Sequence, residues 1–125
     1  MIIKNDLPFE KSDYEEKIFT HPTMLFRYSA ITFNGHRIHY DYPYSTEEEG
    51  YKDLLFHGPL QATLMLRAAE KYKKAKAHFF SHRGVAPVYA NDNLFINIEN
   101  NENGNLNCFT STKDAGMTMK GEAKF

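Results

Sequence analysis

Residues 58–76 read GPLQATLMLRAAEKYKKAK, and this stretch decides the fold. Pro59 favours a helix start, because its ring fixes φ near the helical value and the first helical position needs no N–H donor. Apolar side chains then recur at helical spacing, which predicts one long helix over residues 60–72. Their surface extends almost all the way round, so we expect the helix to be buried on most sides. A group of lysines at its end complements the helix dipole: Lys71, Lys73, Lys74 and Lys76.

The sequence after this helix alternates like an antiparallel sheet. In residues 117–125 apolar and polar side chains alternate, which predicts one buried face and one solvent-exposed face. The Asn-Gly step in residues 100–105 favours a tight hairpin turn, and a second turn is predicted at residues 113–116. The other predicted strands cover residues 78–90 (interrupted near Gly84 and Pro87), 94–99 and 106–112.

The sequence before the helix gives weaker patterns. Residues 23–32, TMLFRYSAIT, are rich in aromatic and β-branched residues, which predicts a strand. Residues 1–20 are polar, and we expect them to be half ordered, with a short helical turn at residues 13–16. A further turn is predicted at residues 37–40. A strand, a buried helix and a strand meander together predict an α+β domain in which one sheet curls around one helix.

Length and composition limit the function classes. The chain of 125 residues fits one domain, which we place at residues 1–125, and so small a domain favours an oligomer. Its net charge of −1 argues against a nucleic-acid partner, which would require a basic face. No apolar run approaches the ~20 residues of a membrane span. The acidic N-terminus does not resemble a leader peptide and the single cysteine, Cys108, cannot form an intrachain disulfide, so we expect a cytoplasmic protein with Cys108 as inert packing.

Two short segments concentrate chemically active groups. The first, residues 33–41, reads FNGHRIHYD and offers two imidazoles, an amide and a carboxylate. His36 and His39, joined by Asp41 or His57, have the donor types of a metal site. However, His-x-x-His is a loose pattern and no further closely spaced ligand follows. We therefore expect no metal.

The second segment, residues 57–60, reads HGPL and coincides with the predicted helix start. Free backbone N–H groups there form a ready site for an anion or for a developing oxyanion. Because Pro59 has no N–H, Gly58 and Leu60 are the donors that remain. The alternative is a plain helix start with His57 packed beneath it, and the residues alone favour neither interpretation.

Longer stretches around these segments carry a resemblance: FRYSAITFNGHRIHYD at residues 26–41, EGY at 49–51 and LLFHGPLQATLML at 54–66. Together they resemble the MaoC-like acyl dehydratases, most of all the catalytic half of the mesaconyl-CoA hydratases and the related mitochondrial 3-hydroxyacyl-thioester dehydratases. FFSHRGVAPVYAND at residues 79–92 resembles the same group. The resemblance implies a hot-dog fold, in which an antiparallel sheet wraps around one long buried helix.

The resemblance also implies roles for individual residues. The family's hydratase motif runs Asp-x-Asn-Pro-x-His, which places His39 at the catalytic histidine, Asn34 at the catalytic aspartate and His36 at the asparagine. Gly58 matches the glycine whose N–H holds the thioester carbonyl. Asn34 departs from the motif, because an amide does not exchange a proton as a carboxylate does. The sequence FN-x-HRIHYD is usual in the mesaconyl-CoA hydratase branch, so Asn34 marks a branch of the family.

The implied chemistry needs a proton shuttle, an oriented water and an oxyanion site. His39 is expected to take and return the proton. Asn34 is expected to orient the water, and the Gly58 N–H to stabilise the enolate. His36 either shares the acid–base work or supports the site from outside, and His57 is expected to support it from outside.

Two charged residues have alternative interpretations. Asp41 either orients the His39 ring or, as we favour, caps the local turn. Arg83 either meets a phosphate of coenzyme A or, as we favour, forms a structural ion pair under the sheet. No metal or organic cofactor is implied, since coenzyme A is part of the substrate.

We therefore expect a homodimer, or a dimer of dimers, that acts as an acyl-thioester hydratase or dehydratase. Family members often carry two hot-dog halves and this chain has the length of one, so a second copy would supply the other half. The expected substrate is a short-chain or dicarboxylic (mesaconyl-type) enoyl group on coenzyme A, with acyl carrier protein less favoured. The alternatives are a non-catalytic acyl-thioester binding module and a hot-dog thioesterase. The helix start has no carboxylate, which disfavours the thioesterase.

Overall fold

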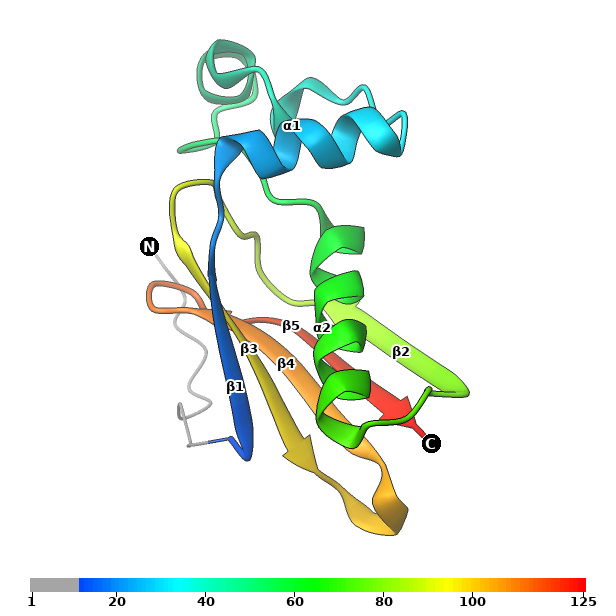
Figure 1. Cartoon of the computed structure of the whole chain (residues 1–125). Coiled ribbons are helices and arrows are strands. Elements are labelled where there is room, and N and C mark those ends of the chain that lie inside the picture. Colours follow the sequence, from blue (N-terminus) through cyan, green and yellow to red (C-terminus); the bar gives the residue numbers. More distant parts are fainter. Residues whose placement is uncertain (1–11) are drawn as a thin grey trace.

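The framework of the protein is a five-stranded antiparallel sheet with one long helix against it, as Figure 1 shows. The computed structural model describes residues 12–125. The helix, α2, spans Gly58–Lys73, which confirms the predicted long helix and the α+β class. The strands lie in the order β1-β3-β4-β5-β2, and every neighbouring pair is antiparallel. Their bounds are Tyr14–Phe19 for β1, Phe79–Gly84 for β2, Asn93–Asn100 for β3, Leu106–Thr112 for β4 and Gly116–Lys124 for β5.

The apolar face of α2 packs on the middle of the sheet. Met65, Ala68 and Ala69 are completely buried on this face. On the sheet side the core consists of Ile96, Ile98, Leu106, Cys108, Met119 and Ala123. The expected burial on most sides is only partly confirmed, because Thr63 and Arg67 are exposed to solvent. The helix therefore buries one broad face and keeps a polar stripe in water.

The strand predicted at residues 23–32 is wrong, because this segment forms the helix α1 (Pro22–Ile31). Pro22 lies in the first turn, where a missing N–H is tolerated. Leu25 and Ser29, four residues apart, are its buried positions, so the side chains follow helical spacing. Aromatic and β-branched content favours a strand, but tertiary packing of these two positions overrides that preference.

The helical turn predicted at residues 13–16 is also wrong, because β1 begins there and pairs with β3 over its whole length. Half-buried and exposed side chains alternate along β1, as expected for a strand at the edge of a sheet. Its partner strand is far away in the sequence, so the pairing leaves no local signal. The half-ordered segment expected at residues 1–20 falls partly on residues 1–11, which lie outside the described part of the chain.

The hairpin predicted between β3 and β4 is confirmed. Asn103 and Gly104 both have positive φ (63° and 78°) in its turn, a conformation that asparagine and glycine adopt readily.

In β5 the predicted alternation fails at Thr118, which is completely buried. The register between β4 and β5 shifts at this point, and the Thr118 hydroxyl turns inward, 2.8 Å from that of Thr110 and 3.2 Å from the Gln61 side-chain oxygen.

Two expectations from composition concern the cysteine and the membrane. Cys108 is buried, and burial raises the pKa of its thiol to about 12, so the thiol stays protonated and Cys108 is confirmed as inert packing. In the described residues, no helix has both the length and the hydropathy of a membrane span.

A second apolar cluster packs α1 and the loop before α2 against the first turn of α2. Leu25 of α1 and Leu60 of α2 are both buried in it. The other buried members are Leu54, Phe56, Val88, Ala90 and Leu94. Figure 1 shows α1 crossing above the N-terminal end of α2. This packing brings the two segments with candidate chemistry to one end of the long helix.

Candidate functional site

His39 is held in one orientation by the backbone. It ends a short 3-10 helix, Arg37–His39, and its Nδ1 lies 2.7 Å from the Leu55 carbonyl oxygen. A carbonyl oxygen only accepts hydrogen bonds, so Nδ1 carries the proton, and Nε2 of the neutral ring keeps its lone pair. The Leu55 N–H in turn donates to the Ile38 carbonyl at 2.9 Å. The two segments with candidate chemistry are thus connected by hydrogen bonds, and Nε2 of the neutral His39 ring is left as a possible acceptor.

The surroundings keep the His39 ring neutral. Burial lowers the pKa of His39 below the ordinary histidine value, the Leu55 carbonyl opposes this shift, and the charge of His36 adds to it. The His36 ring is exposed and meets the His39 ring edge-on, with 5.9 Å between centroids. His36 therefore stands beside the proposed base on the solvent side.

His57 lies directly against His39. The two rings are stacked, with centroids 3.8 Å apart and planes 16° from parallel. His57 is only 1% exposed, and its Nε2 is 2.8 Å from the Ser29 hydroxyl of α1. The Tyr28 ring packs edge-on against it at 4.7 Å. Burial, and then the charge of His39, lower the pKa of His57 to about 4, so His57 is neutral at physiological pH.

The start of α2 supplies backbone donors next to this pair of rings. The first N–H groups of an α-helix have no acceptor within the helix. In α2 these belong to Gly58 and Leu60, because Pro59 has no N–H. The positive end of the helix dipole lies at the same place. The structure therefore brings His39, His57 and Gly58 together, whichever of the two interpretations of the helix start holds.

Asn34 lies on the wall of a neighbouring cavity. Its side-chain oxygen accepts the His36 N–H at 3.1 Å, and its own N–H donates to the Ser29 carbonyl at 2.9 Å. The cavity holds about 340 Å³ and is open to solvent. It is lined by Phe26, Ser29, Ala30, Phe33, Asn34, Gly35 and Tyr40. Of these, Ser29 links the cavity to the stacked histidines, since it is bonded to His57.

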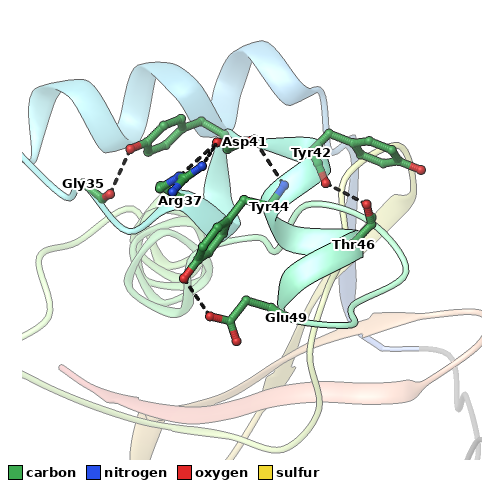
Figure 2. Close-up of polar contacts among 8 residues, drawn as sticks. Gly35, Arg37, Asp41, Tyr42, Tyr44, Thr46 and Glu49 are labelled. Carbon is green, nitrogen blue, oxygen red and sulfur yellow. Dashed lines mark hydrogen bonds and ion pairs between the residues drawn. The ribbon is translucent and has the colours of Figure 1, made fainter.

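Asp41 caps a turn, as expected. One oxygen accepts the Tyr44 N–H at 3.2 Å, and the other pairs with the Arg37 guanidinium at 2.9 Å, which lowers the pKa of Asp41. Figure 2 shows these contacts together with the Tyr44–Glu49 hydrogen bond. The alternative, that Asp41 orients the His39 ring, is not what the structure shows, because the Leu55 carbonyl occupies that position.

Arg83 lies apart from this cluster, on the edge strand β2. It is exposed and stands opposite Lys120 of β5. Within residues 12–125 it takes part in none of the ion pairs, so the structural ion pair that we favoured is wrong. Two cations face each other at this position instead. In the same range, no three His, Cys, Asp or Glu side chains are placed to share a metal ion.

Ser29, which bonds His57 in the candidate site, is not indicated by the sequence patterns. It lies in the segment predicted as a strand, where its side chain would have no defined partner. The signal was present in the spacing, because Leu25 and Ser29 are four residues apart and share one face of a helix.

Comparison with known proteins identifies the family to which the chain is similar. It matches the family of hydroxyacyl-thioester dehydratase type 2 over residues 3–90. It is 50% identical over 68 residues to the mesaconyl-C(4)-CoA hydratase of Chloroflexus aurantiacus, covering 54% of this chain and 24% of that protein. It is 40% identical over 88 residues to the mitochondrial hydroxyacyl-thioester dehydratase type 2 of Schizosaccharomyces pombe, covering 68% of this chain and 29% of that protein. The chain thus spans about a quarter of the length of these relatives.

Solved structures share the fold. The R-hydratase PhaJ1 of Pseudomonas aeruginosa superposes with a TM-score of 0.74 at 19% identity, over 91% of this chain and 79% of that chain. A chain of the ChsH1–ChsH2 complex of Mycobacterium tuberculosis gives 0.73 at 17% identity, over 88% and 90%. These likenesses confirm the hot-dog architecture. With the family match over most of its length, the chain belongs to the hydroxyacyl-thioester dehydratase type 2 family.

Proposed function

We propose that the protein adds water to an α,β-unsaturated acyl thioester, or removes it from the 3-hydroxyacyl thioester, at the N-terminal end of α2. The observation that carries the proposal is the state of His39. Its ring is buried and neutral, and the Leu55 carbonyl holds the lone pair on Nε2. A neutral imidazole beside N–H groups that have no acceptor within their helix is suited to both parts of this reaction. Both relatives described above are named for reactions of this class.

The reaction can be written with the chain's own groups. In the hydration direction, Nε2 of His39 takes a proton from water while the water oxygen bonds to the β-carbon. Negative charge then develops on the thioester oxygen, where the N–H groups of Gly58 and Leu60 stabilise it. The protonated His39 returns its proton to the α-carbon. Dehydration is the reverse, with His39 first taking the α-proton.

Asn34 is proposed to orient the reacting water. Its side-chain oxygen is occupied by the His36 N–H, which fixes the side chain on the cavity wall. The amide NH₂ group then serves as the donor toward a water in the cavity.

Replacing Asn34 by aspartate is expected to keep hydration within about tenfold of the parent rate and to shift its pH profile. The added carboxylate favours the charged form of a nearby imidazole, so the pKa of His39 rises. The rising limb of kcat/KM, which follows deprotonation of His39, should therefore move to higher pH. The matched control is Asn101→Asp, because the Asn101 side-chain oxygen also accepts a nearby backbone N–H, that of Glu102, in the β3–β4 turn. An unchanged profile in Asn34→Asp would remove Asn34 from the site.

The proposed substrate is a short or dicarboxylic enoyl group on coenzyme A. The cavity beside Ser29 is mainly apolar, with Phe26 and Phe33 in its wall, which suits an acyl chain. The Chloroflexus relative is named for a dicarboxylic acyl-CoA. Arg83 is exposed and outside the ion pairs of residues 12–125, so it is a candidate contact for a coenzyme A phosphate.

A panel of enoyl-CoA thioesters tests the proposed activity. Hydration removes the absorbance of the conjugated enoyl-thioester band, and we expect this loss for at least one short-chain or mesaconyl-type member. Acyl-CoA binding without loss of the band would support the non-catalytic binding module instead. Release of free coenzyme A, detected with a thiol reagent, would support the thioesterase.

We also propose that the protein works as a homodimer or a dimer of dimers. Within residues 12–125 the outer strands β1 and β2 each have one edge without a paired strand, and β2 is almost entirely exposed. The fold is shared with a chain of a two-protein complex. Light scattering should give a mass of at least twice 14.5 kDa, and a mass near one chain across dilution would contradict the proposal. The cytoplasmic location stays a prediction, and the Schizosaccharomyces relative is named as mitochondrial.

A further inference from the structure

The burial of His57 lowers the stability of the folded protein more than an apolar side chain at the same position would. It is 1% exposed, and its Nδ1 has no hydrogen-bond partner among the described residues. A buried polar atom without a partner destabilises the folded state. An apolar ring of similar size would fill the same volume without this loss. The position therefore calls for an explanation beyond packing.

The contacts of His57 point to such an explanation, because they fix its ring on three sides. The Ser29 hydroxyl bonds Nε2 at 2.8 Å, the Tyr28 ring meets it edge-on, and the His39 ring is stacked on its face at 3.8 Å. Ser29 and Tyr28 both belong to α1, whereas His57 precedes α2. The His57 ring thus lies between α1 and the His39 ring and contacts both.

We propose that Ser29 and His57 form a positioning pair for His39: the Ser29 hydroxyl fixes the His57 ring, and the His57 ring fixes the stacked His39 ring so that its Nδ1 stays on the Leu55 carbonyl. The inference rests on the proposed function, in which Nε2 of His39 is the base. The other titratable group facing His39 is His36, which meets it from the solvent side. His57 is faced in addition by Tyr28.

A serine bonded to a histidine also has the form of a nucleophile and its base, but this pair lacks the features of one. Nδ1 of His57 has no carboxylate or other partner among the described residues to orient it. The low pKa of His57 makes it a weak acceptor for a serine proton. Neither Ser29 nor His57 is therefore assigned a covalent step.

The test compares Ser29→Ala with a matched control, Thr32→Ala. Thr32 directly follows α1 as its C-cap, and its exposed hydroxyl donates to the Tyr28 carbonyl, so the control removes a hydroxyl at the same helix end that does not bond His57. Two readouts are used. One is the tautomer of His39, followed by nitrogen-15 NMR of the full chain, and the other is kcat and KM with the best enoyl-CoA of the panel.

In Ser29→Ala we expect the single His39 tautomer to give way to a mixture, because the ring is no longer held on the Leu55 carbonyl. We expect kcat to fall roughly tenfold with KM nearly unchanged, since misplacement of a catalytic group affects chemistry more than binding. Ser29→Thr, which keeps the hydroxyl, should restore both readouts. Thr32→Ala should change neither.

A second variant, His57→Phe, tests the inference if Ser29→Ala folds poorly. His57→Phe keeps a flat ring against His39 and loses the bond to Ser29, so it should show the same mixed tautomer. In the double variant, Ser29→Ala with His57→Phe, kcat should be no lower than in either single variant, because the two residues act as one unit. An unchanged His39 tautomer in both single variants would overturn the inference. If the parent protein hydrates no enoyl thioester, the proposed function fails, and the tautomer comparison still decides whether the pair positions His39.

Discussion

Replacing His39 by alanine is expected to lower enoyl-thioester hydration by roughly 10²-fold or more, as loss of a general acid–base group usually does. The alanine variant loses both the acceptor for the water proton and the donor for the α-carbon. The oxyanion donors at Gly58 and Leu60 remain, so we expect KM to change much less than kcat. Initial rates from the enoyl-thioester absorbance, with binding of a saturated acyl-CoA measured in parallel, check both parts.

The matched control for this variant is His36→Ala. His36 is also an imidazole of the same motif, but it is exposed and only meets the His39 ring edge-on. We expect a smaller loss than in His39→Ala, because His36 acts on the reaction through the charge near His39. If His39→Ala kept nearly the full rate while His36→Ala abolished it, the two roles would be reversed.

The second large effect concerns stability in acid and arises from His57. The pKa of His57 is lowered from 6.5 to about 4 in the folded protein, whereas the unfolded chain has the ordinary value. Between these two pH values the unfolded state binds a proton that the folded state does not, so the free energy of unfolding falls as pH falls. One pKa unit corresponds to about 1.4 kcal/mol, so the loss from His57 is about 3 kcal/mol, most of which is reached by pH 4.

Urea unfolding followed across this pH window measures the effect. His57→Phe removes the titrating group and should flatten the stability profile between pH 6.5 and 4. An exposed histidine, His21, supplies the control, and His21→Ala should keep the slope of the parent protein. A parent-like slope in His57→Phe would show that the acid lability originates elsewhere in the chain.

The parts of the fold with a strong local pattern could be predicted from the sequence. α2 combines a proline start with apolar side chains at helical spacing, and the β3–β4 turn contains an Asn-Gly step with both residues at positive φ. β1 could not be predicted, because it depends on pairing with a strand that begins at Asn93. In α1 the aromatic and β-branched residues favour a strand, and the helical spacing of only two buried positions, Leu25 and Ser29, is a weaker signal.

Some residues of the candidate site could likewise be predicted from the sequence, and others could not. The motif identified His39, His57 and Gly58, and the structure brings these three together. Ser29 was missed because its role depends on α1 crossing the start of α2, which no local pattern contains. The ion pair expected for Arg83 failed for a related reason, since its strand neighbour across the sheet is Lys120 rather than an acid.

The role of His39 as the base is tested most directly by measuring its pKa with two methods. Nitrogen-15 NMR titration gives the pKa of His39 in the free protein, and the pH profile of kcat/KM for hydration gives the pKa of the essential base. We predict that the two values coincide below the ordinary histidine pKa, that kcat/KM rises with pH through this value, and that the neutral ring carries its proton on Nδ1. A profile that stays flat through the NMR pKa of His39, or a neutral ring with its proton on Nε2, would contradict the account.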